Sequence, residues 1–121
     1  MRPITVVLAF ALLAPISMAH ADSLGAAGRI IELEVNNSNA DTYLQYHGRV
    51  VITAVDRESE YRWGGTACSN RTLTESQVTM LQRAIESGMA ITPRYLPGQG
   101  SNKCLVGYVL RSEERRVGKE C

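Results

Sequence analysis

The feature that most limits the fold is how little chain lies between two atypical ends. Residues 1–21 carry a basic start, an uncharged apolar run and the triplet Ala19-His20-Ala21, the pattern of a secretory signal peptide cleaved before Asp22. The apolar run is shorter than the roughly 20 residues that a membrane helix needs. We therefore expect a periplasmic or secreted bacterial protein with no membrane insertion in its mature form.

The other end reads Arg-Ser-Glu-Glu-Arg-Arg-Val-Gly-Lys-Glu-Cys over residues 111–121, which is the in-frame translation of a common short-read sequencing adapter. A natural charged tail is the alternative, but we interpret the segment as non-native. Residues 22–110 then form a single domain with a thin core, in which a covalent cross-link adds useful stability. With both ends set aside, acidic residues slightly outnumber basic ones, although the whole chain has a formal net charge of +1. We therefore expect no binding to nucleic acid or to anionic lipid.

Two cysteines remain once Cys121 is assigned to the tail. Cys68 and Cys104 are an even pair in a chain that we expect in an oxidising compartment, so we predict a structural disulfide. A metal or redox site is the alternative. The spacing is far from C-x-x-C, and His47 is the one histidine left in the mature body. We predict no metal and no cofactor.

Alternating hydrophobicity predicts several strands. In Gly28–Val35 the pattern places one set of side chains inward (Ile31, Leu33 and Val35) and the other outward (Glu32 and Glu34). Two carboxylates on one face of a strand usually mark its solvent-exposed face rather than a catalytic pair.

The next apolar stretch, Thr42–Val55, predicts either one long strand or two short ones. Gly48 lies at its middle, where a long barrel strand would bend or bulge. Val50–Val55 is apolar on both faces, as expected of a buried central strand. A polar turn at Asp56–Ser59 and an alternating strand at Glu60–Thr66 follow.

One helix is well marked. Thr74 and Gln77 have the spacing of a capping box, and Gly88 is the expected left-handed stop. The residues at helical spacing between them form one apolar stripe: Val78, Leu81, Ala84 and Ile85. Met89–Leu96 is the next predicted strand, with Pro93 indicating an edge or a bulge, and Cys104–Leu110 is the last.

The order is therefore three strands, a helix and two strands. This mainly β arrangement with one helix predicts a small Greek-key barrel of the OB type. An open sheet under a single helix is the alternative.

Residues 68–110 also resemble a known family. The segments that carry the resemblance are a loop after a cysteine, a helix end, a strand and a final strand: Cys68-Ser69-Asn70-Arg71-Thr72, Ala84-Ile85-Glu86-Ser87-Gly88, Ile91-Thr92-Pro93-Arg94-Tyr95 and Leu105-Val106-Gly107-Tyr108. They are similar to the OB-fold B subunits of AB5 toxins, most closely the subtilase-cytotoxin B-like group. The resemblance implies a secreted, disulfide-containing barrel that forms a pentameric ring and binds host glycans. Its glycan-binding residues cannot be matched to positions here.

No arrangement of residues points to catalysis. A nucleophile needs a base within hydrogen-bond reach, and His47 reads as a surface or barrel-rim residue. The Gly98-Gln99-Gly100 loop precedes a strand rather than a helix, so it does not match a phosphate-binding loop. We predict a non-enzymatic binding module.

Carbohydrate sites combine an aromatic face with a few placed polar groups. The candidates close together in sequence are Tyr61, Trp63, Ser69, Asn70 and Arg71. The opposing interpretation is that the two aromatic rings belong to the core. A monomeric periplasmic accessory or inhibitor protein that binds another protein is the alternative function, since short edge strands can pair with a neighbour and can also build a homo-oligomeric ring.

Overall fold

The computed structural model describes residues 22–112, so the predicted signal peptide and most of the suspect tail lie outside the described residues. The elements in chain order are β1 (Ser23–Leu24), β2 (Gly28–Val35), β3 (Gly48–Ala54), β4 (Arg57–Trp63), α1 (Glu75–Ser87), β5 (Ala90–Pro97) and β6 (Lys103–Arg111). The predicted order of strands, helix and strands is confirmed, with the short β1 added in front.

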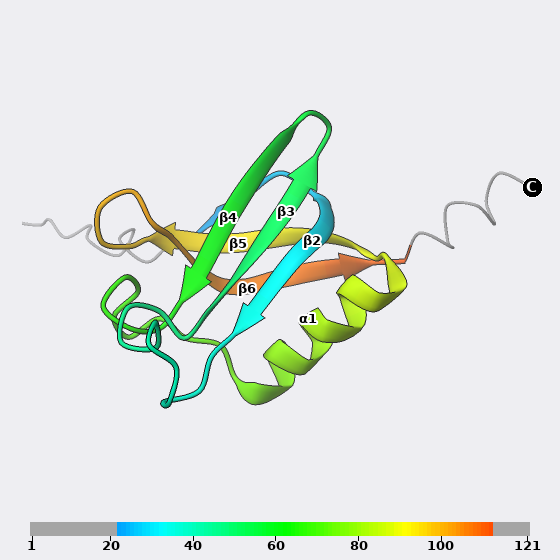
Figure 1. Cartoon of the computed structure of the whole chain (residues 1–121). Coiled ribbons are helices and arrows are strands. Elements are labelled where there is room, and N and C mark those ends of the chain that lie inside the picture. The colour runs from blue at the N-terminus through cyan, green and yellow to red at the C-terminus, as the bar shows by residue number, and fades with distance from the viewer. Residues whose placement is uncertain (1–21, 113–121) are drawn as a thin grey trace, which may run out of the picture.

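Five strands close into an OB-like barrel (Figure 1). β2, β3 and β4 form an antiparallel meander, and β5 pairs with β2 on one side and with β6 on the other. Closure comes from β4 and β6, which lie parallel and share the single bridge Arg62↔Cys104. The prediction of a mainly β barrel with one helix is therefore confirmed, and the open sheet is not formed.

The helix has the ends that its sequence predicts. The Thr74 side chain accepts a hydrogen bond from the Gln77 amide, the Gln77 side chain accepts one from the Thr74 amide, and Gly88 adopts φ 72° at the other end. Leu81 and Ala84 of the apolar stripe are buried in the barrel core. In Figure 1 the helix lies below β2 and β6. None of the described helices is long and apolar enough to cross a membrane.

A β-bulge changes which side chains of β2 face inward. The pairs Ile30↔Ile52 and Glu32↔Val51 leave Ile31 as the extra residue between them. Ile30 is buried as a result, whereas Ile31 is 48% exposed. The strict alternation that placed Ile31 in the core is wrong, because the bulge shifts the inward face by one residue.

The segment before β3 is not a strand. Residues 38–45 form turns, so the predicted strand from Thr42 begins only at Gly48. Gly48 is the first residue of β3 rather than a bend within a longer strand, and the Trp63 ring occupies the space where a side chain at Gly48 would lie. The glycine is therefore explained by the close approach of an aromatic ring.

The β3–β4 turn begins one residue earlier than expected and is shorter than the predicted Asp56–Ser59. Ala54 pairs with Arg57, so Val55 and Asp56 make the turn and residues 57–59 belong to β4. Val55 is fully exposed and has φ 51°, a left-handed conformation that costs a β-branched residue energy. Its predicted place in a buried strand is wrong.

Pro93 lies within β5, which is paired on both sides near this position. It is fully buried, and the register of β5 against β6 shifts between the next two residues, Arg94 and Tyr95. The extra residue at this shift is Val106 of β6, so the irregularity lies opposite β5 and not at Pro93 itself. The alternative of an edge strand is wrong, because β5 pairs with β1 and with β6 here.

Candidate binding groove

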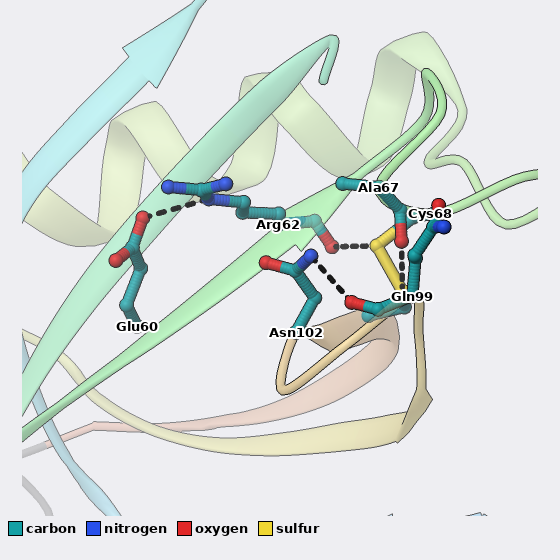
Figure 2. Close-up of a disulfide and its surroundings, with 7 residues drawn as sticks. Glu60, Arg62, Ala67, Cys68, Gln99 and Asn102 are labelled. Atoms are coloured by element: carbon teal, nitrogen blue, oxygen red, sulfur yellow. Dashed lines mark hydrogen bonds and ion pairs between the residues drawn. A yellow bond between two sulfur atoms is a disulfide. The ribbon is translucent and has the colours of Figure 1, made fainter. Parts of the chain in front are cut away.

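The predicted disulfide joins the loop after β4 to the start of β6 at one end of the barrel. Cys68 and Cys104 are both fully buried, with Cα atoms 5.7 Å apart and a sequence separation of 36 residues. Figure 2 shows the bond beside Ala67, where the segment after β4 meets the start of β6. The Sγ of Cys68 also lies 3.5 Å from the Arg62 carbonyl oxygen, so the cross-link lies directly beside the bridge that closes the barrel.

The loop between β5 and β6, residues 98–102, is held in one shape. Its ends meet through the hydrogen bond from the Gly98 amide to the Asn102 carbonyl, 2.8 Å long. The Asn102 side chain donates to the Gln99 carbonyl at 2.7 Å, and the Gln99 amide donates to the Ala67 carbonyl at 3.0 Å. The disulfide and this hydrogen bond to Ala67 therefore fix the loop relative to the segment that follows β4 (Figure 2).

A polar groove of about 560 Å³ lies between this loop and β4. One wall is β4, with Arg57, Glu58, Ser59, Glu60 and Arg62. The other wall is the end of the loop and the start of β6, with Ser101, Asn102 and Lys103. Its volume is within the range of ligand sites, about 300–1,000 Å³.

Lys103 is the cationic side chain that the start of β6 contributes to the groove. Its Nζ lies 5.6 Å from the ring centroids of both Tyr61 and Tyr95. This distance is within the range of a cation–π attraction. Burial raises the pKa of the Tyr61 phenol, so this ring faces the lysine as a neutral group.

The predicted glycan-binding patch is not formed as a single exposed surface. Tyr61 and Trp63 are each only 2% exposed and belong to the barrel core. Ser69 and Asn70 are exposed in the loop after β4, and Arg71 is half-buried. The ring faces are therefore unavailable for sugar stacking, while the polar side chains remain accessible.

The outer face of the meander carries a network of charges. The Arg49 guanidinium donates to Glu34 at 2.8 Å, contacts Glu60 at 3.4 Å and pairs with Glu32. Glu60 also pairs with Arg62 at 3.0 Å, so it belongs both to this network and to the groove. Glu32 and Glu34, which the sequence places on the solvent-exposed face of the strand, are thus both ion-paired to Arg49.

The pKa of the Glu34 carboxyl reflects these contacts. Burial alone would raise that pKa, but hydrogen bonds from Arg49, Asn36 and Tyr46 favour the charged form, and the net result is a lowered pKa. The hydrogen bond to Glu34 raises the pKa of Arg49 in turn. Both groups are therefore charged at neutral pH.

His47 lies at the base of the loop that precedes β3. Its ring stacks on Tyr43, with centroids 4.1 Å apart, and its backbone amide donates to the Trp63 carbonyl. Among residues 22–112 no group of three acidic, histidine or cysteine side chains is placed to hold a metal ion.

Sequence reasoning missed most of the groove. Arg57, Ser101 and Lys103 come from two segments about 40 positions apart in the chain, and no local pattern marks them as neighbours. The clue in the sequence was the pair of cysteines, since a disulfide at Cys104 brings the start of β6 next to the end of β4. Comparisons with family models, with curated proteins and with solved structures find no match for this chain.

Proposed function

We propose that this protein is an exported, non-enzymatic binding module that holds a protein partner in the groove beside β4. The observation that carries the proposal is the groove itself, which has polar walls fixed by a disulfide and by loop hydrogen bonds. A rigid, preorganised site binds without the entropic cost of ordering its loops. The disulfide also suits an oxidising compartment, in agreement with the leader-like residues 1–21.

A protein partner fits this groove better than a sugar does. The two rings that would stack on a sugar are buried in the core, and the walls of the groove carry charged side chains from both sides. A glycan is the second candidate, favoured by the hydroxyl and amide groups of Ser59, Ser101 and Asn102 that line the groove. The AB5-like interpretation would add a ring of five copies.

A photo-crosslinking amino acid at Ser101 tests the proposal in cells that express the protein. We expect one discrete covalent adduct with another protein. The matched control carries the same group at Gln82, an exposed position on α1, and should give no such adduct. Adducts of equal yield at both positions, or none at Ser101, would contradict the proposal.

Two further measurements separate the alternatives. Specific signals on a glycan array that disappear with Asn102→Ala would assign the groove to sugar instead of protein. Light scattering on the oxidised protein distinguishes a monomer from a ring of about five copies, and a ring would favour the toxin-B-like interpretation.

A further inference from the structure

The edge of β4 that faces the groove is incompletely paired. β4 pairs with β3 along its whole length, from Arg57 to Trp63. On its other side, the described residues give it one strand contact, the bridge Arg62↔Cys104. Before that bridge, Ser101, Asn102 and Lys103 face β4 only across the groove, and the β3–β4 hairpin extends past the crossing with β5 at the top of Figure 1.

The hairpin geometry shows which backbone groups are free. A two-residue turn closes on a hydrogen-bonded pair, here Ala54 and Arg57, and hydrogen-bonded pairs then recur at every second residue. Ser59 therefore exchanges its backbone hydrogen bonds with β3. Glu58 and Glu60 direct their N–H and C=O groups to the opposite side, where the described part of the chain supplies no strand partner. Unpaired strand edges of this kind accept an additional strand.

The charges along this edge are separated by face. Glu58 and Glu60 project on one face, while Arg57 and Ser59 project on the other, as alternation requires. Within residues 22–112 neither Glu58 nor Arg57 has an ion-pair partner, and Lys103 lies across the groove without one. A strand that matches this edge would carry basic residues on the face of Glu58 and Glu60 and acidic residues on the face of Arg57.

A second copy of β4 does not match it. The residues whose backbone groups point outward must pair with each other, so a two-fold arrangement centred on Ser59 places Glu58 of one copy opposite Glu60 of the other. An axis at Glu58 or at Glu60 instead places that glutamate opposite itself. Like charges directly opposite each other on neighbouring strands are destabilising. The edge therefore disfavours pairing with itself.

We propose that the free edge of β4, from Arg57 to Glu60, binds an extended segment of a partner protein by strand addition. The segment carries basic side chains opposite Glu58 and Glu60 and an acidic side chain opposite Arg57. It spans about 10 Å along the strand at about 3.4 Å per residue. This inference rests on the proposed function and specifies the chemistry of the partner.

The test uses a blocked peptide, Thr-Glu-Lys-Thr-Lys-Glu-Thr, titrated into the isotope-labelled oxidised protein. We expect NMR shifts at the backbone amides of Glu58 and Glu60 and none on the outer face of α1. In this alignment the backbone N–H groups of the two peptide lysines face β4. Methylation of these two backbone nitrogens should weaken binding at least tenfold. N-methylation of the central threonine, whose N–H points away from β4, should change the affinity less than threefold.

Two variants of the protein complete the test. Glu58→Pro removes an outward N–H that the ladder with β3 does not use, and proline is tolerated at such edges, so binding should fall at least tenfold in a folded protein. Glu58→Lys should weaken the binding of the same peptide. It should strengthen the binding of a second peptide in which the lysines and glutamates are exchanged. Hydrogen exchange supplies a check on folding, because the Ser59 amide should stay protected in both variants.

Several results would overturn strand addition. One is the absence of shifts at Glu58 and Glu60 at millimolar peptide, and another is equal binding by the lysine-methylated peptide. Protection of the Glu58 and Glu60 amides in a concentration-dependent oligomer would assign the edge to a second copy. If the peptide does not bind while the crosslinker at Ser101 still forms its protein adduct, strand addition is wrong and the proposed function as a binding module is retained. If both fail, the proposed function is wrong as well.

Discussion

Removing the disulfide should cost this protein a large part of its stability. The variant replaces Cys68 and Cys104 with alanine, because both sulfurs are fully buried and a serine hydroxyl would need a new hydrogen-bond partner there. The bond closes a loop with a sequence separation of 36 residues. In the chain-entropy model such a closure is worth about 4 kcal/mol. A small domain has about 0.05–0.15 kcal/mol of stability per residue, which is about 5–14 kcal/mol over residues 22–112, so the loss is between about a third and most of the free energy of unfolding.

Urea denaturation followed by the fluorescence of Trp63 measures this loss. We expect the midpoint to fall steeply and the m value to rise, because an unfolded chain without the cross-link exposes more surface. The oxidised and reduced forms of the unaltered protein are the matched pair that separates loss of the cross-link from the effect of the substitutions. A two-state transition that moves by less than about 1 kcal/mol, with an unchanged m value, would refute the entropic argument.

Three further predictions concern single positions. Val55→Gly should raise the free energy of unfolding by about 1 kcal/mol, because it removes the left-handed strain of a β-branched residue, and a lower melting temperature would contradict this. Gly48→Ala should destabilise by at least about 2 kcal/mol and shift the emission of the single tryptophan, since the new methyl group meets its ring. Gly107→Ala, where the added carbon reaches no atom closer than 3.6 Å, is the control. The stabilisation from Glu34 should be present above its ordinary pKa of 4.5 and should disappear as the pH falls through the lowered pKa of the folded state. Urea titrations across that pH range should show that the free energy of unfolding falls less with acid in Arg49→Met than in the unaltered protein.

The helix is the element that the sequence predicts best. Thr74, Gln77 and Gly88 act through short-range hydrogen bonds and backbone conformation, and such signals survive in any tertiary context. The strand order could also be predicted, because alternation and turn composition are local. The bulge at Ile31 could not, since it arises from the pairing of β2 with β3 and leaves no mark within β2 itself.

The candidate site was harder to predict for a related reason. Alternation shows that Tyr61 and Trp63 share one face of β4, but it does not show which face is inside the barrel. In the folded barrel the face with both rings is the inner one, and Glu58 and Glu60 lie outside. The groove depends on where the β5–β6 loop lies relative to β4, which only the closed barrel defines.

The single bridge between β4 and β6 also has a consequence for how the chain folds. The β2–β4 meander and the β5–β6 hairpin each consist of strands adjacent in sequence, so each can form early with little loop-closure entropy. Joining the meander to the hairpin instead closes long loops, and the strand pairs that offset the entropy lost there are the two between β2 and β5 and the one between β4 and β6. Oxidation of the neighbouring cysteines then makes that late step irreversible on the folding time scale. We expect the meander and the hairpin to form first and the oxidant to determine how quickly the finished barrel accumulates.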